Sequence, residues 1–134
     1  MRPQPLRQLV LVVEDDSRLV SAVVMMIEDW GYECVVVPSP ARAAAALGNR
    51  IGDVVAVVTD VSLHESYTGV RSAAAIEAAV GRRVPVIATS SQPGLATSSG
   101  FTMVLAKPYD PEDLRRWLVA QIGTQIGQST LKAC

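Results

Sequence analysis

Short apolar runs alternate with amphipathic segments along most of the chain. Five runs predict strands, at Leu9–Val13, Cys34–Val37, Val54–Val58, Val84–Ala88 and Met103–Ala106. Nearly unbroken apolar runs are typical of strands covered on both faces, as in a parallel sheet. Helical spacing or capping residues mark four segments between and after them: one from Asp16 or Ser17 to Gly31, one from Pro40 to about Leu47, one over Val70–Val80 and one from Pro111 to about Gln125. This alternation predicts an α/β fold, a doubly wound domain around a five-stranded parallel sheet.

Length and composition limit the domain count and the classes of partner. The chain has 134 residues, which fits one domain over residues 1–134 with a core of about 8–127 and short tails. A net charge of -1 argues against direct nucleic-acid binding. The longest purely apolar run, Ala22–Ile27, has six residues, too few to cross a membrane. The start of the chain is polar and unlike a signal peptide, so we expect a cytoplasmic location with both cysteines reduced.

Polar residues follow several of the predicted strands. They are Glu14, Asp15 and Asp16 after the first, Asp60 after the third, Thr89, Ser90 and Ser91 after the fourth, and Lys107 after the fifth. In open parallel sheets, ligands bind beyond the carboxyl ends of the strands. Carboxylates without histidine suit Mg²⁺, and beside such an ion one carboxylate is able to attack a phosphoryl group while Lys107 binds its oxygens. The residues thus favour acyl-phosphate chemistry.

Four motifs in order resemble the receiver domain of two-component response regulators, from about Gln8 to Gly123. They are Val-Val-Glu14-Asp15-Asp16, Val-Val-Thr-Asp60, Pro85-Val-Ile-Ala-Thr-Ser90 and Lys107-Pro108-Tyr109. The resemblance implies a flavodoxin-like fold and a single-domain response regulator. It also implies that the phosphoryl donor is a histidine kinase or a histidine phosphotransfer protein, and that the output acts through protein partners.

The resemblance also implies a role for each matching residue. Asp60 is the expected phosphoacceptor; Glu14, Asp15 and Asp60 are expected to hold Mg²⁺ with the backbone carbonyl of Ser62. Ser90 would contact the phosphoryl group, although an Ala-Thr pairing seen in some single-domain regulators favours Thr89 instead. Lys107 would pair with the phosphoryl group, and the Lys107–Pro108 bond is expected to be cis.

The chain departs from the family pattern in three places. The loop after Asp60 is about one residue longer than usual; its His64 and Tyr67 receive no role. The segment between Ser90 and Lys107 has a turn-forming composition, which predicts that a fourth helix is shortened or absent. Val104 occupies the position of the family's aromatic switch, with Phe101 and Tyr109 as nearby alternatives. Ordering of the loop from Ser90 to Gly100 is one hypothesis for how phosphorylation is then communicated.

Two other functions compete with a receiver. A phosphorylation-independent adaptor would keep the fold without the chemistry. A metabolite phosphatase with an aspartyl-phosphate intermediate usually carries a second acid two residues after its nucleophile, where this chain has Ser62. We therefore expect a signalling phosphoacceptor, a monomer or weak dimer, and not a metabolic enzyme, with only slow phosphorylation from small donors and slow loss of its own phosphoryl group.

Overall fold

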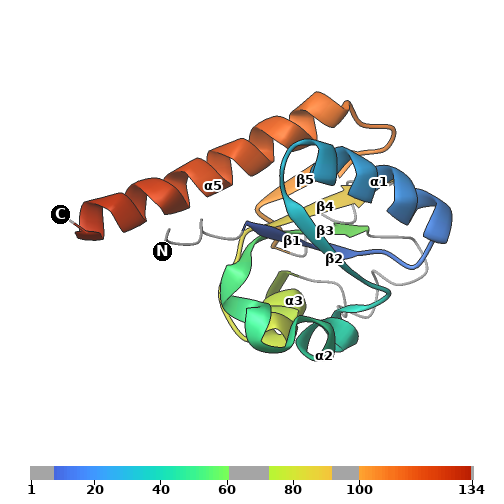
Figure 1. The fold of residues 1–134 in the computed structure, drawn as a ribbon. Helices are drawn as coiled ribbons and strands as arrows, with labels where there is room; N and C mark the ends of the chain where they lie inside the picture. Colours follow the sequence, from blue (N-terminus) through green and yellow to red (C-terminus); the bar gives the residue numbers. More distant parts are fainter. Residues whose placement is uncertain (1–7, 61–72, 92–99, 134) are drawn as a thin grey trace.

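The computed structural model describes residues 8–60, 73–91 and 100–133, which form one parallel sheet with helices on both faces (Figure 1). The five strands lie in the order β2-β1-β3-β4-β5. The strands are β1 (Leu9–Val13), β2 (Glu33–Val37), β3 (Val54–Asp60), β4 (Val86–Ser90) and β5 (Met103–Ala106). The helices are α1 (Ser17–Asp29), α2 (Ala43–Leu47), α3 (Ala73–Val80) and α5 (Pro111–Ala133), with the 3₁₀ turns η1 (Pro40–Arg42) and η2 (Gly48–Asp53). This is the doubly wound fold that the apolar runs predict.

Each face of the sheet has its own hydrophobic core. On one face, α1 and α5 contribute Ile27, Leu114 and Leu118, which pack against residues such as Val12 and Val58. On the opposite face, α2 and α3 contribute a second set of buried residues, including Ala43, Leu47, Ala73, Ile76 and Val80. Side chains alternate between the faces of a strand, so both neighbours in a run such as Val57-Val58 are buried. Burial on both faces explains why the strands read as continuous apolar runs.

The register of the sheet aligns the carboxyl ends of its strands. Val13 pairs with Thr59 of β3, Asp60 pairs with Thr89 of β4, and Ser90 pairs with Ala106 of β5. The ladder is extended beyond the last strand pair by the amide of Lys107, which donates to the carbonyl of Ser90 at 2.8 Å. The polar residues that follow the strands therefore share one edge of the sheet.

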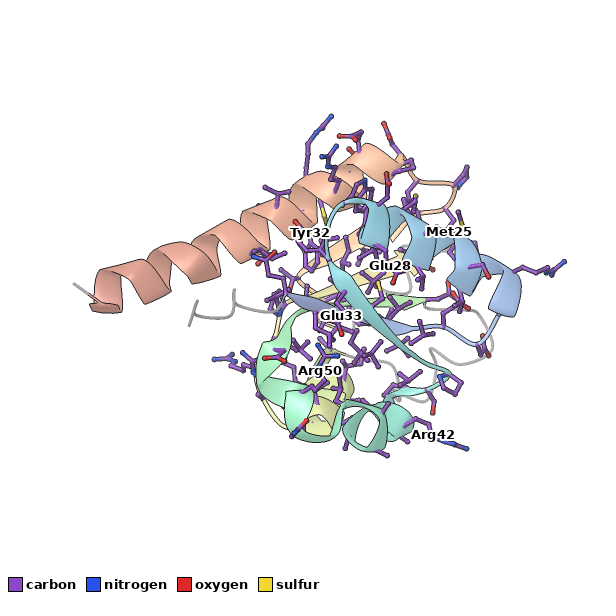
Figure 2. The ribbon with its side chains drawn as sticks, in the orientation of Figure 1. Met25, Glu28, Tyr32, Glu33, Arg42 and Arg50 are labelled. Atoms are coloured by element: carbon purple, nitrogen blue, oxygen red, sulfur yellow. The ribbon has the colours of Figure 1, made fainter. Side chains whose placement is uncertain are left out.

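The starts of α1 and of β2 are fixed by local contacts. Asp16 caps α1, because its Oδ1 accepts a hydrogen bond from the Arg18 amide at 3.0 Å. At the outer edge of the sheet, Arg50 forms an ion pair with Glu33 of β2 and lies 3.5 Å from Asp53 of η2, measured from Nε to Oδ2 (Figure 2). These ion pairs connect the edge strand to the turn that leads into β3.

The predicted boundaries of the fourth strand and the predicted end of the last helix are wrong. The fourth strand begins at Val86 instead of Val84, because Pro85 has no amide hydrogen and the Val84 amide donates to the Glu77 carboxylate at 3.3 Å. It also ends at Ser90 instead of Ala88, since Thr89 and Ser90 pair with β5. The last helix extends past Gln125 to Ala133.

Several expectations concern residues outside the described ranges. These are the start of the third helix before Ala73, the loop holding Ser62, His64 and Tyr67, and the central part of the fourth-helix segment, residues 92–99. The described residues of that segment, 91 and 100–102, are not helical. Within the described ranges, no helix combines the length and the apolar character needed to cross a membrane.

Candidate functional site

An acidic side chain and a basic one meet at the carboxyl edge of the sheet. Asp60 is the last residue of β3, and Lys107 is the first residue after β5. The Lys107 ammonium forms an ion pair with Oδ1 of Asp60, and only 12% of the Asp60 side chain is exposed. The pairing was expected from the sequence only with a phosphoryl group between the two residues. In this structure the ammonium binds the carboxylate directly.

Glu14 lies beside this pair in a more buried position. It directly follows β1, only 6% of the residue is exposed, and its Oε1 accepts a hydrogen bond from the Asp16 amide at 3.0 Å. Burial raises the pKa of Glu14 above its ordinary value of 4.5, and the nearby carboxylates of Asp60 and Asp15 raise it further. The hydrogen bond from Asp16 and the charge of Lys107 act in the opposite direction. The site therefore holds more negative charge than one ammonium offsets.

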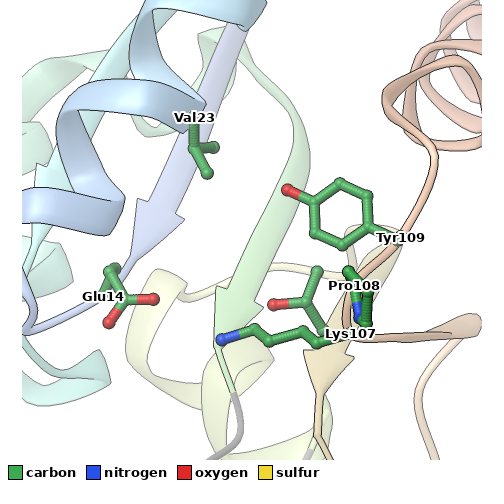
Figure 3. Close-up of a pocket in the computed structure, with 6 residues that line it drawn as sticks. Glu14, Val23, Lys107, Pro108 and Tyr109 are labelled. Atoms are coloured by element: carbon green, nitrogen blue, oxygen red, sulfur yellow. The ribbon is translucent and has the colours of Figure 1, made fainter.

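A pocket of about 430 Å³ opens next to these groups, between α1 and the turn that follows β5 (Figure 3). Val23 of α1 and Pro108 and Tyr109 of the turn provide its apolar walls, and its polar lining comes from Glu14, Thr89 and Lys107. The Tyr109 hydroxyl points across the pocket toward α1. Burial raises the pKa of Tyr109, and the carboxylates of Asp60 and Glu14 add to the effect. Tyr109 is therefore close enough to the acidic site to sense its charge.

The two candidate hydroxyls at the end of β4 occupy different surroundings. Both Thr89 and Ser90 are buried. Thr89 lies opposite Asp60 in the β3–β4 pairing and lines the pocket. Ser90 is one position further along β4, and its carbonyl accepts the amide of Lys107. Because successive side chains leave opposite faces of a strand, only Thr89 shares the face of Asp60.

The residues at this edge fit a hard divalent cation. The donor set contains carboxylate oxygens from Glu14 and Asp60, with the exposed Asp15 next to Glu14. Within the described ranges, no three His, Cys, Asp or Glu side chains form a group able to hold a metal by themselves. Mg²⁺ commonly uses one or two protein carboxylates and keeps several waters, so two carboxylates agree with its chemistry. The predicted fourth donor, the Ser62 carbonyl, lies outside the described residues.

The sequence identified the charged residues of the site but missed part of the pocket. Tyr109 and Val23 come from distant parts of the chain. The sequence did not place Val23 at the site, and it placed Tyr109 in the lysine motif and among the alternatives to the aromatic switch, but not on a wall of the pocket. The Lys107–Pro108 bond is cis, as the resemblance implies. The signal in the sequence that could have placed Tyr109 at the pocket was its position two residues after Lys107, since the turn that follows β5 begins at the site.

The fold and the site define a class: a five-stranded doubly wound domain with a carboxylate and lysine site at the carboxyl ends of its strands. The family model for the response regulator receiver domain matches residues 10–118. The chain therefore belongs to the response regulator receiver domain family, which acts in two-component signalling.

Solved structures agree with this family. One is the receiver domain of the sensor histidine kinase PA1611 from Pseudomonas aeruginosa PAO1, which has a magnesium ion coordinated in its active site cleft. Its sequence is 28% identical, the match covers 87% of this chain and 98% of that one, and the TM-score is 0.67. A receiver domain protein from Clostridium thermocellum is 17% identical, with coverage of 90% and 97% and a TM-score of 0.66. A CheY-like receiver domain from Methylobacillus flagellatus is 22% identical, with coverage of 87% and 99% and a TM-score of 0.63. No curated protein gave a match.

Proposed function

We propose that the chain accepts a phosphoryl group on Asp60 from a histidine kinase or a histidine phosphotransfer protein. The observation that carries the proposal is the ion pair between Asp60 and Lys107 beside the buried Glu14, at the edge of the sheet where ligands bind. Membership of the receiver family supports the same role.

In the proposed reaction, a carboxylate oxygen of Asp60 attacks the phosphorus of a phosphorylated imidazole on the donor. The new oxygen–phosphorus bond forms as the phosphorus–nitrogen bond breaks, and the imidazole nitrogen keeps the electron pair. The Lys107 ammonium already contacts Asp60, so a small movement lets it bind an oxygen of the arriving group and offset the developing charge. Ser90 is the proposed hydroxyl donor to a second oxygen, with Thr89 as the alternative.

Glu14, Asp15 and Asp60, together with the Ser62 carbonyl, are the proposed ligands of Mg²⁺. Bound there, the ion would neutralise carboxylate charge and polarise the phosphoryl oxygens. The excess negative charge around Glu14 supports this assignment, because burial and two neighbouring carboxylates raise its pKa. The magnesium in the cleft of the Pseudomonas aeruginosa receiver domain is consistent with it.

The acyl phosphate on Asp60 is proposed to be a signal and not a metabolic intermediate. Its slow hydrolysis to inorganic phosphate would limit the lifetime of the signal, and the phosphorylated domain would act by binding or releasing another protein, as a monomer or weak dimer. We also propose a reducing, cytoplasmic setting, in agreement with the low count of two cysteines.

Intact-mass spectrometry after incubation with acetyl phosphate and Mg²⁺ tests the proposal. We expect one added phosphoryl group, a gain of about 80 Da. The gain should disappear in the variant Asp60→Asn and after chelation of the metal. A wild-type chain that gains no phosphoryl group from acetyl phosphate or from phosphorylated kinases would instead support a phosphorylation-independent adaptor.

A further inference from the structure

One aromatic residue shares a pocket with the phosphoacceptor site. Tyr109 packs against the core between α1, α5 and the sheet, and it lines the pocket together with Val23 of α1. It is two residues after Lys107, in the same turn. A movement of the Lys107 backbone therefore reaches Tyr109 through a single intervening residue, Pro108.

The other aromatic candidate near β5 lies on the opposite face of the sheet. Phe101 packs with Val104 against Ala88, and it also contacts the core formed with α2 and α3. Val58 and Leu105 belong to the core between the sheet and helices α1 and α5. Asp60 lies two positions after Val58, and Lys107 lies two positions after Leu105. Because side chains alternate along strands, Asp60 and Lys107 share the face of Tyr109 and not that of Phe101.

The pocket also gives the Tyr109 ring room to reorient. Its volume of about 430 Å³ is comparable with small-molecule sites, so the ring is not enclosed by close-packed neighbours on every side. Val23 forms the opposite wall, and the Tyr109 hydroxyl points toward α1 (Figure 3). A change in the position of the ring therefore alters the surface between α1 and the start of α5.

We infer that Tyr109 is a positioning residue that transmits the phosphorylation state of Asp60 to α1. This inference rests on the proposed function, because it requires Asp60 to receive the phosphoryl group. When Lys107 leaves the carboxylate for the phosphoryl oxygens, the turn after β5 shifts and the Tyr109 ring moves within the pocket against Val23. The surface that partners meet at α1 then differs between the two states.

The test uses the full chain containing 3-fluorotyrosine, with beryllofluoride and Mg²⁺ as a stable mimic of the acyl phosphate. The chain has three tyrosines, whose fluorine resonances are assigned from the variants Tyr32→Phe, Tyr67→Phe and Tyr109→Phe. We expect the Tyr109 resonance to shift on activation, with a smaller change at Tyr32, which packs in the same core. An unchanged Tyr109 resonance at a saturated site would overturn the inference.

A second measurement asks whether Tyr109 is required for the response of α1. Amide resonances around Val23 are compared with and without beryllofluoride at equal site occupancy, read from the bound-fluoride signal. The response should shrink several-fold in Tyr109→Leu, persist in Tyr109→Phe, and persist in the matched control Tyr32→Leu. A response in Tyr109→Leu equal to that of wild type would contradict the inference. Failure of the wild-type chain to bind beryllofluoride or to take up a phosphoryl group is a different result, because it would reject the proposed function itself.

Discussion

Lys107 and Asp60 form a direct ion pair although 46 residues (61–106) separate them in the chain. The contact exists because β3 and β5 both flank β4 and end at the same edge of the sheet. Replacement of Lys107 by alanine should lower the rate of phosphorylation by acetyl phosphate about 100-fold, the usual scale for removing one stabilising donor. Rates are measured by intact-mass spectrometry over time.

Lys132→Ala is the control for this variant, since Lys132 is the other lysine of the chain and belongs to the last turn of α5. Its rate should equal that of wild type. Equal rates for all three proteins would show that Lys107 does not stabilise the transfer.

The burial of Glu14 predicts a specific pH dependence of stability. Because the pKa of Glu14 is raised in the folded chain, the folded state keeps this proton to a higher pH than the unfolded state. Protonated Glu14 therefore favours the folded state. This contribution to stability is complete at a pH below 4.5, the ordinary pKa, and it is lost as the pH rises through the pKa of Glu14 in the folded chain. Without metal at pH 7, Glu14→Gln should therefore melt above wild type, by about 4 °C if the gain is ~1 kcal/mol.

The difference in melting temperature between Glu14→Gln and wild type should shrink toward pH 4.5, and added Mg²⁺ should raise the melting temperature of wild type more than that of the variant. Thermal melts in a chelating buffer from pH 4.5 to 7 test the first statement. A difference that does not change with pH would mean that Glu14 is not titrating in this range.

The sequence left two hydroxyls open for the phosphoryl contact, and their positions permit a direct comparison. Ser90 is linked to Lys107 through its carbonyl, whereas Thr89 lines the pocket opposite Asp60. Strand alternation favours Thr89, whereas the position of Ser90 counted from Pro85 in the family motif favours Ser90, and we base the prediction on the motif. We expect Ser90→Ala to slow phosphorylation about tenfold, less than Lys107→Ala because a neutral hydrogen bond is weaker than a charge-assisted one, and Thr89→Val to have the smaller effect. The same rate measurement serves both variants. The reverse order would assign the phosphoryl contact to Thr89.

A structural arginine far from the acidic edge offers a test of the fold. The Arg82 guanidinium donates through Nη1 to the carbonyls of Val54 at 2.7 Å and Ile51 at 3.1 Å. Arg82→Ala should lower the free energy of unfolding by about 1 to 2 kcal/mol. This is less than the loss expected for fully buried charged hydrogen bonds, because Arg82 is partly exposed to solvent. Urea unfolding measures this change. The neighbouring exposed Arg83 is the matched control, and a comparable loss in Arg83→Ala would contradict the role of these contacts.

The sequence predicted the order of strands and helices because burial on both faces leaves continuous apolar runs such as Leu9–Val13. It also predicted that Asp60 and Lys107 belong to one site, since parallel strands bring their carboxyl ends together. It did not predict that β4 begins at Val86, because that boundary depends on pairing with β3 and β5 and on the side chain of Glu77. Tyr109 was also missed as a pocket residue, since its position depends on packing against the distant Val23.

The central claim is that Asp60 is the phosphoacceptor, and mapping the modified residue tests it most directly. Borohydride reduces an aspartyl phosphate to homoserine, which tandem mass spectrometry then locates in the tryptic peptide 51–71. This peptide contains both Asp53 and Asp60, so fragment ions distinguish the acceptor from an internal control. We predict homoserine at position 60 only, dependent on Mg²⁺. Homoserine at position 53, or at another aspartate such as Asp15, would contradict the account.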